Sequence, residues 1–257
     1  MRRYIYILLF AVIPTLAFSG ETLQGSTPFT KEAGDSAYSQ RRFAEAVEIY
    51  EKVIDNEGGS VELYYNLGNA AYRSNQLGKA ILGYERALRI DPTDEDTRAN
   101  LEFVQSRMKD EVPEQYEIFF VTWMTALFNL LGINTWAIIG VVAFVVALLG
   151  ILLVIFNSKG TKRNLLIVTI AFSVFVAIFA NIAVYNIHAS ITDNSYAIVM
   201  NEEVSLKSTP DNSGTVLIKV HEGRKVRIVD DTLKDWKEIE LEDGKVGWVK
   251  ADAIERI

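Results

Sequence analysis

Four residues between positions 65 and 73 have side chains suited to recognising a protein partner. They are Tyr65, Asn69, Tyr72 and Arg73, which recur at spacings of about four and three. Residues three and four apart lie on the same side of a helix, so these side chains would share one face. Aromatic rings and arginine dominate the binding free energy of many interfaces. The pattern therefore predicts a face that binds a protein.

The residue types that most enzymes use for catalysis are absent or isolated in the sequence. The chain has no cysteine, which excludes disulfides, thiol catalysis and thiolate metal sites. Its two histidines, His188 and His221, are far apart and have no partner nearby in the sequence. The acid pair Asp230–Asp231 lies in a predicted turn, and no nucleotide-binding loop, zinc-binding helix or serine elbow is present. We expect no enzymatic activity, no cofactor and no metal site.

Charge and hydropathy narrow the class of protein further. The net charge of −7 and the pI near 5.1 are unsuited to nucleic acid, because phosphate binding needs a clustered basic surface. Mean hydropathy is +0.13 although 23% of the residues are charged. Apolar segments must therefore be separated from polar domains along the chain.

A repeat with a period of 34 residues occupies the first half of the chain. Residues 27–58 overlay residues 61–92. The aligned pairs are Gly34 and Gly68, Tyr38 and Tyr72, Phe43 and Leu77, Ala46 and Ala80, Tyr50 and Tyr84, and Val53 and Ala87. This period is typical of helix–turn–helix repeats, and the second copy resembles the tetratricopeptide (TPR) family closely. The residues that carry this resemblance are Tyr64, Leu67, Gly68, Ala80, Tyr84, Ala87 and Pro92.

The resemblance predicts an all-α helical repeat over residues 27–111. Gly68 and Ala80 should lie where the two helices of a repeat cross, because small side chains let the backbones approach. Pro92 lacks the N–H that a helix interior requires and should end the second copy. The pair Gly58–Gly59 should end the first copy equally well.

Residues 93–109 predict a capping helix after the second repeat. Leu101 and Val104 fall on one face, which would cover the open apolar side of the stack. Acidic residues concentrate between Asp91 and Glu117. We expect these acidic side chains to form a solvated surface.

The TPR resemblance implies a peptide-binding groove lined by the first helix of each repeat. The partner-binding residues that it indicates are Lys31, Asp35, Tyr38, Tyr65, Asn69, Tyr72 and Arg73. Lys31 and Asn69 match positions with which some TPR proteins clamp the C-terminal carboxylate of a ligand. Asp35 stands where that pattern has asparagine, and Ala99 and Phe103 replace its basic pair, so we do not expect such a clamp. The alternative is that these side chains only line the inner face or pack against neighbours.

Two uncharged apolar segments in the second half are long enough to form a two-helix transmembrane hairpin. They cover residues 136–156 and 165–187, and each reaches the ~20 residues that spanning a hydrocarbon core requires. The short loop between them carries Lys159, Lys162 and Arg163. Short positive loops stay cytoplasmic, so both flanks of the hairpin would lie outside the cytoplasm.

A shorter apolar and aromatic-rich segment, residues 118–131, precedes the first span. Trp123 and Trp136 suit a membrane–water interface, where indole has one wet and one dry edge. We interpret the segment as an interfacial helix along the outer leaflet, or as an early part of the helix bundle. The alternative, a third span, would leave residues 132–135 as a very tight turn.

The N-terminus predicts a secretory signal peptide over residues 1–19. Arg2 and Arg3 precede an apolar region too short to span a bilayer comfortably, and Ala17 and Ser19 fit a cleavage site. An uncleaved anchor is the alternative. Either form exports the segment that follows, in agreement with a cytoplasmic loop. We expect a multi-pass protein of a bacterial inner membrane with its TPR repeats and C-terminal domain in the periplasm.

Short strands separated by turns follow the second apolar segment. The candidates are residues 197–200, 204–206, 216–220, 225–229, 238–241 and 246–249. Over residues 195–257 the pattern resembles bacterial SH3-like domains, which implies an all-β barrel. The residues that carry this resemblance are Ala197 to Val199, Ser208 to Pro210, Gly223 to Val226, Trp236 and Gly247 to Val249.

Related SH3-like domains bind peptides or peptidoglycan. The resemblance implies an aromatic ligand shelf that includes Trp236 and Trp248. The alternative is that the two rings close the small core of the barrel. Gly247 would allow close approach of two strands at a barrel corner.

The order of signal peptide, TPR repeats, transmembrane hairpin and SH3-like domain resembles the BatE-like proteins of the Bacteroides aerotolerance (Bat) group. The resemblance implies envelope partners, among them membrane proteins with von Willebrand A domains, and a role in envelope stress tolerance. Two functions agree with it. One is an adaptor that recruits an envelope protein through its TPR repeats, and the other is a cell-wall sensor or anchor that binds peptidoglycan through the SH3-like domain.

Overall fold

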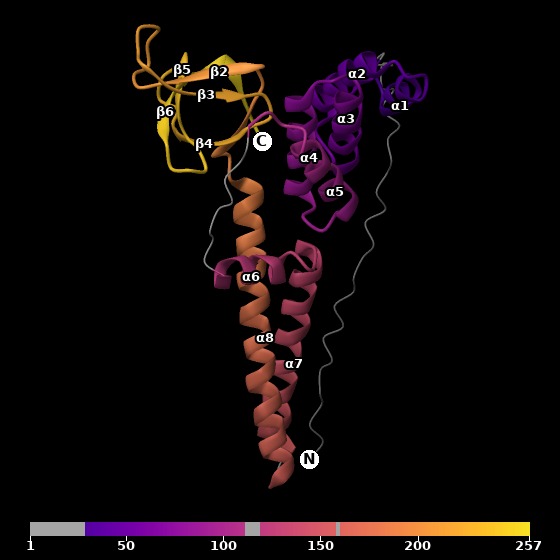
Figure 1. Cartoon of the computed structure of the whole chain (residues 1–257). Coiled ribbons are helices and arrows are strands. Elements are labelled where there is room, and N and C mark those ends of the chain that lie inside the picture. The colour runs from indigo at the N-terminus through magenta and orange to yellow at the C-terminus, as the bar shows by residue number, and fades with distance from the viewer. Residues whose placement is uncertain (1–28, 111–118, 158–159) are drawn as a thin grey trace.

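The computed structural model describes residues 29–110, 119–157 and 160–257, which form three parts (Figure 1). A helical domain comes first, two long apolar helices follow, and a β-sheet domain ends the described chain. The helical and sheet domains lie side by side at one end of the helix pair. The predicted signal peptide (residues 1–19) and Lys159 of the predicted loop lie outside the described residues.

The helical domain begins and ends its helices at residues suited to that purpose. Its helices are α1 (Lys31–Ser39), α2 (Phe43–Glu57), α3 (Val61–Arg73), α4 (Leu77–Ile90) and α5 (Glu95–Gln105). Thr30, Ser60 and Asp94 precede α1, α3 and α5, and each side chain accepts a hydrogen bond from a backbone N–H of the first turn. Gly58 has a φ of 90°, a left-handed conformation that favours glycine, and ends α2 as predicted. Pro92 follows the end of α4.

Helices α3 and α4 cross with their backbones in contact at two glycines. A Cβ atom on Gly83 would lie 2.8 Å from the carbonyl oxygen of Tyr64 and 2.9 Å from the backbone nitrogen of Gly68. A Cβ atom on Gly68 would lie 2.6 Å from the ring of Tyr84. Ala80 is fully buried, but Gly83 is the α4 residue whose backbone meets α3. The sequence interpretation did not single out Gly83.

One apolar cluster runs through the helical domain. It contains Ala37 of α1, residues of α2 to α4, and both Leu101 and Val104 of α5. The apolar face expected of the capping helix is therefore buried against the repeats. The cluster also includes Ile198 of the sheet domain, so the two domains share part of one core.

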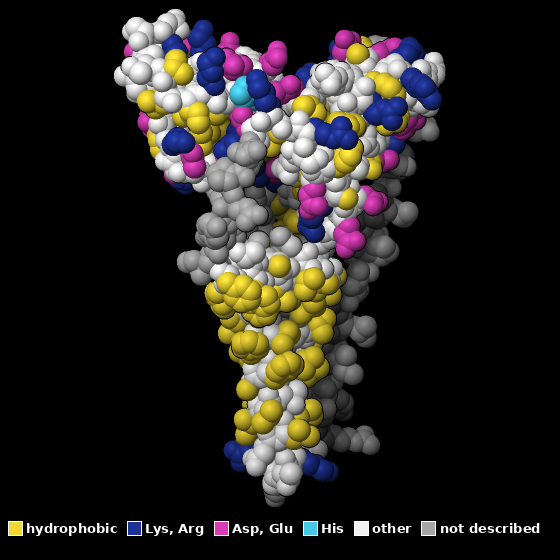
Figure 2. Space-filling view, viewed as in Figure 1, with side chains coloured by type: hydrophobic (Ala, Val, Ile, Leu, Met, Phe, Trp, Pro, Cys, Tyr) yellow, Lys and Arg dark blue, Asp and Glu magenta, His cyan; other side chains and the backbone are white. Residues whose placement is uncertain are grey.

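Helices α7 (Ile133–Asn157) and α8 (Thr161–Thr192) are long and apolar enough to cross a membrane, by length and composition. They pack lengthwise against each other and extend beyond the predicted spans. Figure 2 shows apolar side chains over this pair, and Lys and Arg side chains at its end farthest from the two domains. Charges of both signs are spread over the domains themselves.

The short helix α6 (Phe119–Phe128) lies across α8 (Figure 1). Its 10 residues are too few to span a bilayer. Trp123 is exposed on it, but the expectation for Trp136 is wrong, because this residue is buried. The Trp136 indole Nε1 donates a hydrogen bond to the carbonyl oxygen of Phe128 at 2.8 Å, and its ring packs on Phe179. The polar edge of Trp136 thus bonds to the protein instead of to interfacial water.

The C-terminal domain is an open antiparallel sheet. Its strands are β1 (Tyr196–Val199), β2 (Glu203–Lys207), β3 (Val216–His221), β4 (Lys225–Asp230), β5 (Trp236–Glu240), β6 (Val246–Lys250) and β7 (Ile254–Arg256). The order is β3-β2-β6-β5-β4-β1-β7. Strands β3 and β7 are edges, so the sheet does not close into the predicted barrel. The prediction also missed β7, because three residues directly after a short 3-10 helix show no alternation to detect.

Gly247 lies where β6 meets β2. A Cβ atom there would be 2.8 Å from the carbonyl oxygen of Lys207 and 2.8 Å from Cγ of Leu206. The predicted close approach of two strands at Gly247 is therefore confirmed. Any side chain at this position would push β2 and β6 apart.

Polar contacts fasten α4 to the sheet domain along its length, and Arg86 pairs with Glu255 of β7 at 3.0 Å. Among the described contacts, the side chain of the α4 N-cap residue, Gln76, makes no capping bond. Instead Glu222 Oε1 accepts a hydrogen bond from the backbone N–H of Gly78 at 2.8 Å. Nearer the other end of α4, Lys225 Nζ pairs with Glu85 Oε2 at 2.8 Å. The sheet domain therefore caps and holds α4.

His221 has a partner that its sequence neighbourhood does not show. Its Nδ1 lies 2.5 Å from Oδ1 of Asp110, and Oδ2 of Asp110 accepts a hydrogen bond from the His221 backbone N–H at 2.9 Å. The two residues are 111 positions apart. Asp110 is part of the acidic segment for which we expected a solvated surface, and here it joins the helical domain to the sheet.

Arg89 of α4 lies where all three parts of the protein meet. Its Nε donates to the carbonyl oxygen of Ile191 near the end of α8, at 2.5 Å. Its Nη2 donates to Oδ1 of Asn194 at 2.7 Å, and its Nη1 donates to the carbonyl oxygen of Ile257. One guanidinium group thus links the helical domain, the apolar helix pair and the sheet domain.

Candidate partner-binding face

Helices α1, α3 and α5 place the predicted partner-binding residues on one continuous surface. We call it the α1–α3–α5 face. It consists of the predicted Lys31, Asp35, Tyr38, Tyr65, Asn69, Tyr72 and Arg73 together with Glu62, Asn66, Asn100 and Phe103. Hydrogen bonds, an ion pair and a ring contact join these residues from helix to helix.

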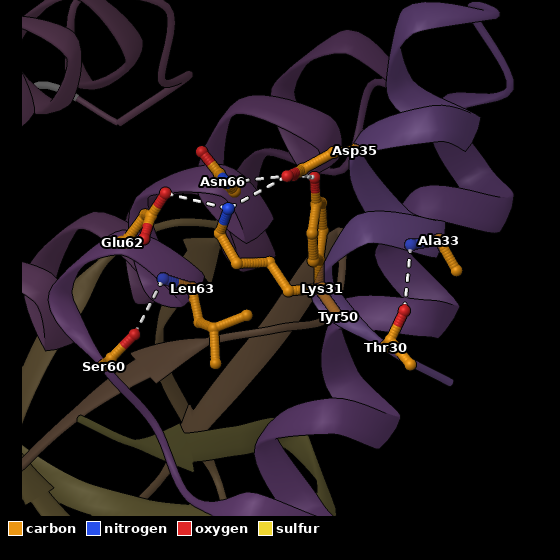
Figure 3. Close-up of polar contacts among 9 residues, drawn as sticks. All are labelled: Thr30, Lys31, Ala33, Asp35, Tyr50, Ser60, Glu62, Leu63 and Asn66. Carbon is orange, nitrogen blue, oxygen red and sulfur yellow. Dashed lines mark hydrogen bonds and ion pairs between the residues drawn. The ribbon is translucent and has the colours of Figure 1, made fainter. Parts of the chain in front are cut away.

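Lys31 lies between two carboxylates (Figure 3). Its Nζ is 2.9 Å from Oε1 of Glu62 and 2.9 Å from Oδ2 of Asp35. Hydrogen bonds to Glu62 and then to Asp35 raise the pKa of Lys31 above its usual value. An ammonium group that is already paired twice is poorly placed to bind the carboxylate of a ligand. The geometry agrees with the expectation that no carboxylate clamp forms.

Asp35 connects the first three helices (Figure 3). Its Oδ1 accepts hydrogen bonds from the Tyr50 hydroxyl at 2.6 Å and from Nδ2 of Asn66 at 3.2 Å. Burial raises the pKa of Asp35, but the hydrogen bonds from Tyr50 and Lys31 outweigh it and leave the pKa below its usual value. Burial and the bond to Asp35 raise the pKa of Tyr50. The carboxylate therefore stays ionised and the phenol stays a donor at neutral pH.

A second polar set lies where α3 meets α4 and α5. Oδ1 of Asn69 accepts hydrogen bonds from the Tyr84 hydroxyl at 2.8 Å and from Nδ2 of Asn100 at 3.3 Å. Nδ2 of Asn100 also lies 3.2 Å from the Tyr65 hydroxyl oxygen, which accepts from it. In the described part of the chain, Nδ2 of Asn69 donates no hydrogen bond. The amide of Asn69 is thus held in place with donors left for a ligand.

Aromatic rings border the polar groups. The rings of Tyr72 and Phe103 meet edge to face at 5.6 Å, and Phe103 is 47% exposed. The rings of Tyr38 and Phe43 meet at 5.2 Å. The Arg73 guanidinium lies 4.9 Å from the Phe43 ring centre, within the range of a cation–π contact. Tyr38, Tyr72 and Arg73 are thus oriented by ring contacts instead of being free on the surface.

The sequence interpretation left four members of this face out of the predicted partner-binding residues, and one of them is Glu62, which pairs with Lys31. Asn66 and Asn100 contribute amides, and Phe103 contributes an exposed ring. Asn100 follows Asn66 by 34 residues, and Phe103 follows Asn69 by 34 residues. The period therefore leads from the predicted Asn69 to Phe103, but it gives no signal for Asn66 or Asn100, because neither is the equivalent of a predicted residue.

The packing of α1 to α4 repeats with the sequence period. In each helix pair, a glycine of the first helix lies against a tyrosine of the second: Gly34 on Tyr50, then Gly68 on Tyr84. Residues 31–95 match the family model of the tetratricopeptide repeat. This region of the chain therefore contains TPR repeats, a fold that serves protein–protein interaction. A comparison with the curated proteins found no match to the chain.

On the sheet domain, Trp236 and Trp248 lie on the face opposite the apolar core. Ile239 of β5 and Val249 of β6 are buried in that core. Successive strand residues point to opposite faces, so Trp236, three residues before Ile239, and Trp248, next to Val249, point away from it. The alternative that the two rings close the core is therefore wrong.

The strand register brings the two indoles near one another. Trp236 pairs with Lys250, and Trp248 pairs with Glu238, which puts the rings at diagonal positions of one face. Trp248 also pairs with Lys207 of β2, whose Nζ lies 5.7 Å from the Trp236 ring centre. A hollow of about 290 Å³ adjoins Trp236, Lys207 and Lys250. We call Trp236, Trp248, Lys207 and Lys250 together the tryptophan shelf.

Proposed function

We propose that the protein is a membrane-anchored adaptor whose TPR repeats bind an extended segment of a partner protein on the α1–α3–α5 face. The observation that carries this proposal is the hydrogen-bonded set of Tyr84, Asn69, Asn100 and Tyr65, which fixes polar groups on neighbouring helices. Groups that are already ordered lose little conformational entropy on binding. The sheet domain occupies α4, so the α1–α3–α5 face is the part of the repeats that we assign to the partner.

The chemistry of the face defines the segment that it would bind. Lys31 is balanced by both Asp35 and Glu62, so the face does not favour an acidic or C-terminal ligand. The amide of Asn69 suits the peptide groups of an extended chain, which offer carbonyl acceptors and N–H donors. The exposed ring of Phe103 suits an apolar side chain of that segment. We therefore expect an internal, neutral or basic segment.

Binding is tested by capture of partners from mild detergent with the intact protein. Combining Tyr65→Ala with Arg73→Ala should reduce capture more than tenfold, because losing an aromatic or arginine anchor costs about 2 kcal/mol or more. Tyr64→Ala is the matched control, since Tyr64 is the neighbouring tyrosine of α3 and packs on Gly59. Circular dichroism monitors folding. If the double variant keeps every partner of the wild type, the proposed binding face is wrong.

We assign the two domains to the extracytoplasmic side of a bacterial inner membrane. Support comes from the apolar lengths of α7 and α8 and from Lys162 and Arg163 at the start of α8. Alkaline phosphatase fused after Ile257 should be active, and fused after Gly160 it should be inactive. The reverse pattern would refute this orientation.

We further propose that the partner belongs to a Bat-type envelope complex. The support is the likeness of the domain order to BatE-like proteins, and membrane proteins with von Willebrand A domains are the expected partners. Mass spectrometry of complexes purified from the native membrane tests this proposal. Purified complexes without von Willebrand A proteins would leave the adaptor function and reject the Bat assignment.

The tryptophan shelf supports a second candidate function, binding of peptidoglycan. Aromatic faces stack on sugar rings, and Lys207 and Lys250 beside Trp236 suit the carboxylates of peptide stems. Sedimentation of the protein with purified sacculi tests this function. Trp236→Ala should reduce co-sedimentation, while the Tyr65→Ala and Arg73→Ala double variant should not. Equal sedimentation of all three proteins would exclude the shelf as the binding site.

A further inference from the structure

Helices α7 and α8 leave an apolar groove between them on the outside of the pair. Its volume is about 540 Å³, and its lining includes Phe144 and Ala147 of α7 and Ala177, Ile178 and Ile182 of α8. The two alanines are small and lie among larger side chains. Small residues of this kind let a further helix approach closely in a membrane.

Asn181 introduces a polar group into this groove. The side chain is exposed, and its Nδ2 donates to the carbonyl oxygen of Ala177 in its own helix at 2.8 Å. In the described part of the chain, its Oδ1 accepts no hydrogen bond. Asn181 lies six residues before Ile187, the end of the apolar segment, which is roughly 9 Å along the helix. If α8 spans the bilayer, this acceptor lies within the hydrocarbon, where an unsatisfied polar group is costly.

The side chains that line the groove carry no charge. A partner helix with Lys, Arg, Asp or Glu at this depth would find no counter-charge in the groove. An amide differs, because it contains a donor and an acceptor and is therefore complementary to a second amide. Two copies of this chain insert with the same orientation, so their Asn181 side chains lie at the same depth.

We propose that the groove binds a second copy of this chain, so that the protein forms a twofold symmetric dimer in the membrane through paired Asn181 amides. In such an isologous contact, each copy presents the same residues to the other. The ridge formed by Ile178 and Ile182 of one copy packs beside Ala177 of the other, and the amides bond across the axis. This inference rests on the membrane anchoring in the proposed function, and it is independent of what the TPR repeats bind.

Self-association is measured with the full chain in liposomes, by energy transfer between fluorescent proteins fused after Ile257. The wild type should associate as the protein-to-lipid ratio rises. Asn181→Leu should weaken association roughly 3- to 15-fold, the range that interhelical hydrogen bonds give in membranes. Asn181→Gln keeps the amide and should retain most of the association. Asn186→Leu is the matched control on the same helix, outside the groove, and should not change it.

The absence of cysteine from the sequence allows a second test without background. Ile178→Cys places a thiol in the groove and should give disulfide-linked dimers on mild oxidation. Phe172→Cys places a thiol on an equally apolar and exposed part of α8 outside the groove, and should not. Equal cross-linking at the two positions would show random collisions and overturn the proposal, as would a cross-link to a different protein.

Three further outcomes separate this inference from the proposed function. A chain that alkaline carbonate extracts from the membrane refutes both the anchoring and the dimer. A chain that stays in the membrane but is monomeric at every ratio refutes the dimer alone. Association that Asn181→Leu leaves unchanged refutes the role of the amide pair and with it the proposed interface. Partner capture on the α1–α3–α5 face is measured separately and is unaffected by these results.

Discussion

The contact between Gly83 and α3 allows a prediction in which two opposing effects can be compared. Replacing a glycine within a helix by alanine ordinarily stabilises the helix by about 1 kcal/mol. In Gly83→Ala the new Cβ atom would lie 2.8 Å from the Tyr64 carbonyl oxygen and 2.9 Å from the Gly68 nitrogen. Both are backbone atoms, which cannot rotate away. Overpacking typically costs about 1–3 kcal/mol, and a clash with rigid atoms belongs at the upper end.

The net expectation for Gly83→Ala is a loss of about 2 kcal/mol in the free energy of unfolding of the TPR region. For a domain of this size, that lowers the melting temperature by roughly 10 °C. Hydrogen exchange of the α3 and α4 amides in the full chain, followed against urea, measures the loss where it occurs. Lys79→Ala is the control on the same helix, because its partly exposed ion pair with Glu51 is worth at most about 1 kcal/mol. A stabilised Gly83→Ala would show that the two backbones are not in contact.

Three other changes probe separate contacts. Glu222→Ala removes the cap of α4 and should speed hydrogen exchange in its first turn by an amount equivalent to about 0.5–2 kcal/mol, whereas Glu222→Gln, which keeps an acceptor, should lose less. Asp35 has a folded pKa below its usual 3.8, so its contribution to stability is present above pH 3.8 and is lost as the pH falls through the folded pKa. The difference in unfolding free energy between wild type and Asp35→Asn should therefore shrink from pH 7 to pH 2.5. A constant difference would contradict this. Trp136→Phe removes the bond to α6 at a cost of about 1–3 kcal/mol and should expose α6 to thermolysin, while Trp123→Phe, at an exposed position, should not.

The sequence predicted those features of the fold that local patterns encode. The 34-residue period located the repeats, the cap at Gly58 and the buried face of α5, because each depends on residues close together in the chain. The uncharged runs located α7 and α8. The alternation of short segments located six strands of the sheet, but β7 has only three residues and was missed.

Contacts between distant segments could not be predicted in this way. His221 and Asp110 carry no local mark of their pairing, and Glu222 gives no sign in the sequence that it caps α4. The open edge of the sheet depends on how β3 and β7 are placed in space, which strand patterns do not specify. On the candidate face, the structure brings the predicted residues together. The pairing of Lys31 with both Asp35 and Glu62 could not be predicted, because it depends on where Glu62 of the next helix pair lies in space.

The guanidinium of Arg89 helps to fix how the helical and sheet domains sit at the end of α8. Its three bonds hold the last turn of α8 to the TPR region and to the end of the sheet. A helix that continues directly into a domain held by such bonds positions that domain rigidly, whereas a flexible linker would let it move. With the anchoring proposed above, the α1–α3–α5 face would keep a constant height and angle above the bilayer.

A rigidly positioned face cannot move toward a partner, so the partner has to reach the face. Under the anchoring proposed above, a partner in the same membrane would have to reach the face with its own linker, and a flexible linker of about 20 residues spans roughly 25 Å on average. Replacing Arg89 would remove three bonds at the junction with α8, while the contacts of Glu222 and Lys225 with α4 would still hold the helical domain to the sheet.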